Sequence, residues 1–174
     1  MAEPFLKYGN EYNWHAVYTR LYHEKKVESL FREQGLEVFL PKKIVKRRWS
    51  DRIKLIEEPL IRPYIFVFVN RKEYLKVLQV PSVLNYVCFN GKAAIIPEAQ
   101  INILKTITGS AISCEILNTT CAIADQVIVR SGPLRGCKGE VVRIDDRNHL
   151  VINILPNCFS VKIGLENTLV ERID

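Results

Sequence analysis

Hydrophobic and polar positions follow two different patterns along the chain. In roughly the first hundred residues, strand-like and helix-like stretches are interspersed. Apolar and β-branched residues fill 14–19 and 64–69, and the unbroken apolar run 64–69 is typical of a central strand. Further strands are expected at 37–44, 52–56 and 82–89. Apolar residues at helical spacing, with capping signals at the ends, predict three helices at 23–35, 70–80 and 97–109.

The pattern changes after residue 109. Between 110 and 121 the periodicity is lost and Ser, Thr and Asn accumulate, which indicates a linker. Beyond it, short apolar segments alternate with Gly, Pro, Asp and Asn turns and contain no helical stretch; they are 127–129, 139–144, 150–155, 160–163 and 168–170. We therefore predict an α+β domain at 12–109, an antiparallel sheet flanked by helices, and a small five-stranded β-barrel at 122–174.

Composition indicates a folded protein of the cytoplasm. Of the 174 residues, 48% are hydrophobic and 25% charged, which argues against long disordered segments. No apolar run approaches the roughly 18 residues of a membrane span, and the start lacks the layout of a signal peptide. The five cysteines are odd in number and form no CxxC pair, so we expect reduced thiols and no metal site.

The net charge of +6 is concentrated in one segment. Residues 42–54 hold seven basic side chains against the single Asp51, so 7 − 1 accounts for all of it. Such a segment favours a local anionic partner, above all nucleic acid. The alternative is a solvated hairpin whose charges keep it soluble and discourage pairing at its edges.

Catalytic motifs are missing from the sequence. The three histidines are scattered, and GxSxG, HExxH and GxxxxGK[ST] do not occur. We expect neither an enzyme nor a cofactor.

Two sets of motifs carry a family resemblance. Residues 125–141, DQVIVRSGPLRGCKGEV, resemble the KOW motif, in which glycines allow positive φ and close approach of the chain. The N-terminal part contains WHAVY, FLP, EPLIRPYIFV and VLNYVCFNG, starting at residues 14, 39, 58 and 83. In this order and spacing they resemble the N-terminal domain of NusG-type transcription factors, and the specialised RfaH and UpxY paralogues more than a housekeeping NusG.

The resemblance departs from the family at one turn. Family members usually have Phe-Pro-Gly-Tyr before the central strand, whereas this chain has Ile61-Arg62-Pro63-Tyr64. The contacts of this turn are therefore the least transferable.

The resemblance implies a polymerase-binding domain followed by an SH3-like KOW barrel. In the family, an apolar concavity of the first domain receives the clamp helices of RNA polymerase. The matching positions here are Tyr18, Ile61, Tyr64 and Phe66. The alternative is that these are core residues of the sheet.

The resemblance also implies contacts with DNA. The segment 20–26 matches the place where the paralogues touch the non-template strand, so Arg20 and Lys26 would contact phosphates and Tyr22 or His23 a base. The alternative is a set of solvated charges on the first turn of a helix. In the basic hairpin, the residues expected to attach electrostatically to DNA or to the polymerase surface are Lys46, Arg47 and Arg48.

In the barrel, Leu155 matches the loop through which the family binds ribosomal protein S10 or termination factor Rho, although it could instead close the barrel core. Because the second domain is rich in Val and Ile, we expect a stable barrel and not a helical hairpin. The implied function is that of a monomeric elongation or antitermination factor that suppresses pausing or termination, for a particular operon such as a surface-polysaccharide one. The alternatives are a housekeeping NusG and a ribosome- or RNA-associated KOW module.

Overall fold

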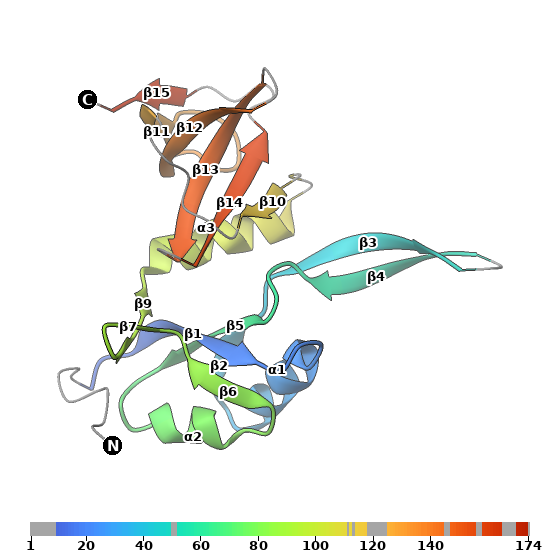
Figure 1. The fold of residues 1–174 in the computed structure, drawn as a ribbon, viewed down its shortest axis with the longest axis vertical. Coiled ribbons are helices and arrows are strands. Elements are labelled where there is room, and N and C mark those ends of the chain that lie inside the picture. Colours follow the sequence, from blue (N-terminus) through green and yellow to red (C-terminus); the bar gives the residue numbers. More distant parts are fainter. Residues whose placement is uncertain are drawn as a thin grey trace. The chain divides into compact units, whose positions relative to one another are not determined.

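The computed structural model describes residues 10–49, 52–110, 112, 114–117, 125–144, 147–155, 158–164 and 170–173. The chain divides into two compact units, Met1–Glu98 and Ala99–Asp174 (Figure 1). Among the described residues, no helix is long and apolar enough to cross a membrane.

A five-stranded antiparallel sheet forms the centre of the first unit. Its strands are β1 (Asn13–Thr19), β2 (Glu37–Phe39), β5 (Tyr64–Val69) and β6 (Val83–Tyr86), in the order β2-β5-β1-β6, with β9 (Ile95–Ile96) also paired to β1. The predicted strands at 14–19 and 64–69 are confirmed, and β5 lies inside the sheet as expected. The strand predicted at 82–89 is divided, because its end forms β7 (Cys88–Phe89), which pairs with β8 (Lys92–Ala93).

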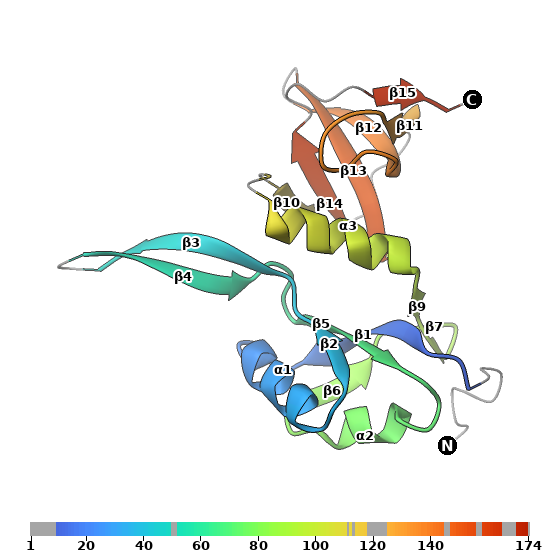
Figure 2. The same cartoon turned by 180° about the vertical axis from the view of Figure 1, so that it is seen from behind.

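Two helices cover one face of this sheet (Figure 2). α1 (Glu24–Glu33) and α2 (Tyr74–Gln79) contribute Val27, Phe31 and Val77 to a core that also contains Val17 of β1 and Ile65 of β5. Both helices were predicted. The chain before α2 turns as the sequence indicated, since the side-chain oxygen of Asn70 accepts hydrogen bonds from the backbone N–H groups of residues 72 and 73.

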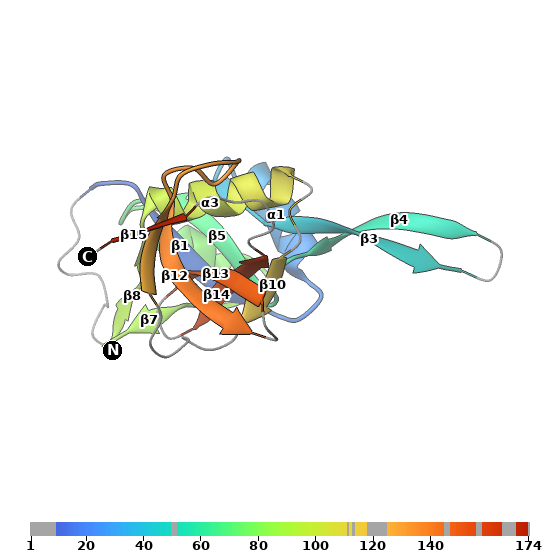
Figure 3. The ribbon, with the colours of Figure 1, turned by 90° about the horizontal axis from the view of Figure 1, so that it is seen from above.

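A long two-stranded hairpin extends from the first unit (Figure 3). It consists of β3 (Lys42–Arg48) and β4 (Ile53–Pro59), which pair with each other. The sequence suggested one strand from 37 to 44, but β2 ends at Phe39, and Pro41, which has no N–H to donate to a ladder, lies in the break. The basic residues therefore lie mostly in a strand and not in the turn.

The second unit combines a helix with a six-stranded antiparallel sheet. The helix is α3 (Glu98–Gly109), and Gln100 on it donates a side-chain hydrogen bond of 3.0 Å to the carbonyl oxygen of Asn153. The sheet has the order β10-β14-β13-β12-β11-β15. Its strands are β10 (Cys114–Leu117), β11 (Asp125–Val129), β12 (Lys138–Ile144), β13 (Arg147–Leu155), β14 (Phe159–Gly164) and β15 (Val170–Arg172).

Four of the five strands predicted for this part are confirmed, those at 127–129, 139–144, 150–155 and 160–163. Of the fifth, predicted at 168–170, residues 168 and 169 lie outside the described residues, and β15 begins at Val170. The closure of the sheet into a barrel stays a prediction. Within the linker predicted at 110–121, residues 114–117 are part of the second sheet. They form β10 and pair with β14, because Ile116 and Leu117 continue the apolar pattern of the sheet despite the polar residues around them. The compact units also group α3 with the second sheet from Ala99 onward, whereas the sequence assigned that helix to the first domain. The predicted domain limits stay predictions.

The glycines of the KOW-like segment have the roles expected of them. Gly132 and Gly136 have positive φ values of 77° and 87°. At Gly139 in β12, an added Cβ would lie 2.9 Å from both Cδ1 of Leu150 and the carbonyl oxygen of Val151. The adjacent strand can approach this closely only because residue 139 has no side chain.

We predict that Gly139→Ala destabilises the protein by about 1–3 kcal/mol, because the new methyl group overlaps backbone as well as a side chain. Denaturant unfolding followed by circular dichroism measures this. Gly164→Ala is the matched control, since nothing lies within 4 Å of its Cβ position. Equal stability of the two variants would contradict the prediction.

One histidine is buried in the first unit. His15 is 4% exposed, and its Nδ1 lies 2.9 Å from the carbonyl oxygen of Ala94, to which it donates when that nitrogen carries the proton. Burial lowers the pKa of His15, and the hydrogen bond to Ala94 only partly opposes this. The folded state therefore favours the neutral ring.

Because the pKa of His15 is lowered on folding, the unfolded chain binds the proton first as the pH falls. The contribution of the neutral His15 ring to the free energy of unfolding is complete above the unfolded pKa of about 6.5. It is lost as the pH falls from there through the lower folded pKa. We predict that wild-type stability falls more between pH 7.5 and pH 5.5 than that of His15→Gln. Urea unfolding followed by tryptophan fluorescence reports on the first unit, which contains Trp14 and Trp49. Parallel pH profiles of the two proteins would contradict this prediction.

Candidate functional surfaces

Aromatic side chains gather on the sheet face opposite α1 and α2. Strand alternation directs Val17 toward the helices and Tyr18 away from them, and the register places Trp14 opposite Phe68 and Tyr18 opposite Tyr64. We call Trp14, Tyr18, Phe39, Tyr64, Phe66 and Phe68 the aromatic face. Its ring centroids are 4.8 Å apart for Tyr18 and Tyr64, 5.3 Å for Trp14 and Phe68, and 6.2 Å for Phe39 and Phe66.

Three of the four residues predicted to bind the polymerase clamp lie on this face. Tyr18 and Tyr64 are half-buried, and their hydroxyl oxygens are 3.2 Å apart. Phe66 is fully buried and Ile61 is 2% exposed, so these two side chains are core residues in this structure. The sequence did not single out Phe39 or Phe68 as site residues, although the alternation of side chains along β2 and β5 places both on the same face.

The segment 20–26 forms an exposed loop and the start of α1. Arg20, Tyr22 and Lys26 are exposed, as contacts to DNA require, and Tyr22 is 72% exposed. His23 is half-buried, and its Nδ1 lies 2.8 Å from the hydroxyl oxygen of Ser82. One nitrogen of that ring is therefore engaged within the protein.

Arg62, from the turn that departs from the family pattern, meets this loop. Its guanidinium carbon lies 4.7 Å from the centroid of the Tyr22 ring, which is cation–π geometry. Sequence reasoning missed this residue because its partner is 40 positions away, and no local pattern joins them.

The hairpin divides the three basic residues that were predicted as one group. In the β3–β4 register, Lys46 pairs with Leu55, Arg47 with Lys54 and Arg48 with Ile53. Lys46 and Arg48 therefore share one face of the hairpin, and Arg47 lies on the other. The face with Lys46 and Arg48 also presents the aliphatic side chains of Ile44, Ile53 and Leu55, which are 62–69% exposed.

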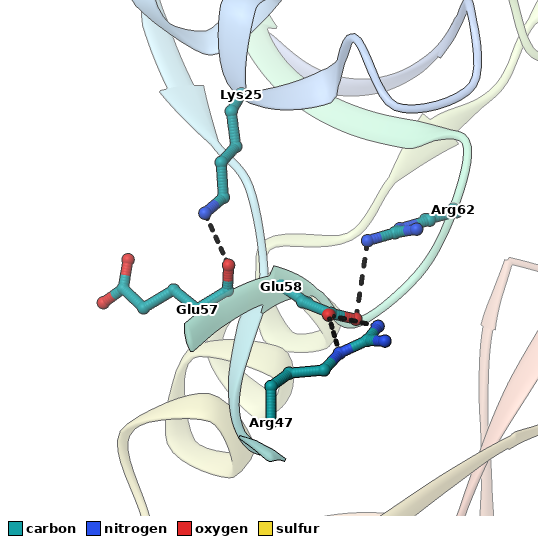
Figure 4. Close-up of polar contacts among 5 residues, drawn as sticks. All are labelled: Lys25, Arg47, Glu57, Glu58 and Arg62. Carbon is teal, nitrogen blue, oxygen red and sulfur yellow. Dashed lines mark hydrogen bonds and ion pairs between the residues drawn. The ribbon is translucent and has the colours of Figure 1, made fainter. Parts of the chain in front are cut away.

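Glu58 connects the base of the hairpin to Arg62 (Figure 4). Its carboxylate accepts hydrogen bonds of 3.1 and 2.7 Å from Arg47 and lies 3.6 Å from Arg62. The hydrogen bond from Arg47, together with the positive charges of Arg47 and Arg62, lowers the pKa of Glu58. Two contacts tie the hairpin to α1, since Lys25 donates to the carbonyl oxygen of Glu57 at 2.5 Å and Lys42 pairs with Glu28 at 2.7 Å.

A protein-family model described as "Transcription termination factor nusG" matches residues 12–105, more than half of the chain. The chain belongs to the NusG family. Members of this family are transcription factors and not enzymes.

One solved NusG structure has a similar fold. A NusG chain from Thermotoga maritima, in a structure titled "Domain interaction in Thermotoga maritima NusG", is 22% identical with a TM-score of 0.52, covering 94% of this chain and 98% of that one. A chain of the MjSpt4:Spt5 complex is 16% identical with a TM-score of 0.28, covering 92% and 99%. No curated protein matches this chain.

In the second unit of this NusG-family chain, the position expected to bind a partner is not on the surface. Leu155 was predicted as an exposed loop residue that contacts ribosomal protein S10 or Rho. It is the last residue of β13, pairs with Phe159 and is 1% exposed, so the expected exposure is wrong and the side chain is a core residue. Its contact with a partner stays a prediction. The sequence favoured a loop position for Leu155 because Pro156 follows it.

Metal ligands do not gather in the described residues of this NusG-family chain, where no group of three His, Cys, Asp or Glu side chains could hold an ion. Cys88 and Cys137 are free thiols. Burial raises the pKa of Cys88 and of Cys137, which keeps both in the neutral thiol form.

Proposed function

We propose that this NusG-family chain is an elongation or antitermination factor that binds the clamp helices of RNA polymerase through its aromatic face. The observation that carries the proposal is the half-buried pair Tyr18 and Tyr64 at one end of that face. Tyrosines are effective interface anchors because they bury a large apolar ring while the hydroxyl can still find a hydrogen-bond partner.

The proposed mechanism needs no chemical step. A factor that binds the closed clamp more tightly than the open clamp shifts the polymerase toward the closed form by the difference in binding free energy. The proposed result is less pausing and less termination.

The proposal includes two contacts with nucleic acid. The loop at 20–26 contacts the displaced non-template strand, which the exposed Arg20, Tyr22 and Lys26 support. The hairpin face with Lys46 and Arg48 adds electrostatic attraction to DNA phosphates. An exposed tyrosine available to a base favours a factor recruited to a particular operon, such as a surface-polysaccharide one, over a housekeeping NusG.

We predict that Tyr64→Ala weakens binding of the full chain to purified RNA polymerase by about tenfold or more, the loss typical of an interface hot spot. Tyr64→Phe retains the ring and should retain most of the affinity. Leu75→Ala, which truncates an exposed side chain on α2, is the control on the other face. The proposal fails if the wild-type chain does not bind polymerase, or if a folded Tyr64→Ala variant binds as tightly as Leu75→Ala.

For the hairpin, we predict that Lys46→Ala and Arg48→Ala each reduce the slope of log Kd for duplex DNA against log salt by about 1. Among the described residues of the first unit, no ion-pair partner is found for the Lys46 or the Arg48 side chain. Arg47→Ala is the matched control and should change the slope less, because Arg47 is engaged with Glu58. Equal slopes for all three variants would contradict the proposal that DNA phosphates contact the face with Lys46 and Arg48.

A further inference from the structure

A planar cation and an aromatic ring meet on the surface of the first unit. The guanidinium of Arg62 lies over the ring of Tyr22, and Tyr22 is 72% exposed. Most of the ring surface is therefore open to solvent, although such a large aromatic side chain is usually more buried. The pair joins the segment of the proposed DNA contact to the one turn where the chain departs from the family pattern.

The backbone around Tyr22 is held in place. Tyr22 has a φ of 67°, a left-handed conformation that non-glycine residues seldom adopt. On one side of it, the N–H of Arg20 donates to the carbonyl oxygen of Ser82 at 2.8 Å, and on the other, the N–H of His23 donates to the carbonyl oxygen of Arg20 at 3.0 Å. The loop thus presents Tyr22 outward without depending on a ligand to order it.

Arg62 is also fixed. Its guanidinium lies 3.6 Å from the carboxylate of Glu58, which is itself held by two hydrogen bonds from Arg47 (Figure 4). The carboxylate therefore orients the guanidinium while most of the Tyr22 ring stays open.

We propose that Tyr22 and Arg62 form a stacking platform for one unpaired base of single-stranded DNA, with Glu58 as the positioning residue for Arg62. The inference rests on the proposed contact with the non-template strand and adds residues to it. An aromatic ring and a guanidinium plane both stack on nucleobases, and the positive charge also attracts the neighbouring phosphate. A base in a duplex has both faces covered by its neighbours, so the platform selects unpaired strands.

The test uses the full chain and a single-stranded oligodeoxynucleotide with 2-aminopurine at one position, whose fluorescence is quenched on stacking. Tyr22→Ala should weaken binding by about fivefold or more and remove the quenching, whereas Tyr22→Phe should preserve both. Arg62→Lys keeps the charge but loses the planar group, so it should reduce the quenching more than the affinity. Lys76→Ala, which removes one positive charge from α2, is the control.

Variants of Glu58 separate its orientation of Arg62 from the general effect of its negative charge on DNA binding. Both Glu58→Gln and Glu57→Gln remove one negative charge, and Glu57 is the exposed neighbour whose carbonyl, not its carboxylate, meets Lys25. If Glu58 positions Arg62, Glu58→Gln reduces the quenching, while Glu57→Gln leaves it unchanged and slightly tightens binding. Identical behaviour of the two variants would overturn the role of Glu58.

Two further outcomes overturn the platform: a folded Tyr22→Ala variant that binds and quenches like Lys76→Ala, or a wild-type chain that prefers an RNA or a duplex of the same sequence. Failure of the platform is distinguishable from failure of the proposed function. A chain that binds polymerase through Tyr64 but is insensitive at Tyr22 overturns the platform alone. A chain that stacks the base through Tyr22 but does not bind polymerase overturns the proposed function alone.

Discussion

The antiparallel pairing of β1 with β5 is the constraint on which the first unit depends. Six consecutive residue pairs, from Asn13 with Val69 to Tyr18 with Tyr64, fix which side chains face the helices and which face away. The same register buries Val17, Ile65 and Val67 against α1 and α2 and assembles the aromatic rings on the opposite face. A slip of one residue would exchange the two faces, so the stability of this unit and its aromatic face have a common origin.

That constraint explains why much of the fold was predictable from sequence. The apolar run at 64–69 and the β-prone run at 14–19 have no plausible place except the inside of a sheet, and both are there. The helix at 23–35 combined apolar spacing with a terminal glycine, and Gly35 has the positive φ of a helix end. Gly139 could likewise be recognised as a position of close approach from its place in the motif.

The less predictable parts depend on contacts between distant residues. The strand at 114–117 was hidden because its pairing partner, β14, lies more than 40 residues later, while the polar residues around it suggested a linker. Leu155 and Ile61 could equally have been surface or core residues, and only the packing of their neighbours decides that both are buried. The stack of Arg62 on Tyr22 joins a loop to a turn through tertiary structure alone.

The aliphatic side chains on the hairpin limit what that element could contribute to reading a DNA sequence. The side chains of Ile44, Ile53 and Leu55 have no hydrogen-bond donors or acceptors. They therefore cannot distinguish one base edge from another, except by contact with the methyl group of thymine. Lys46 and Arg48 beside them suit phosphates, which are the same in every sequence. For a DNA strand that contacts both elements, the hairpin would supply residence time, and discrimination between sequences would fall to the loop that carries Tyr22.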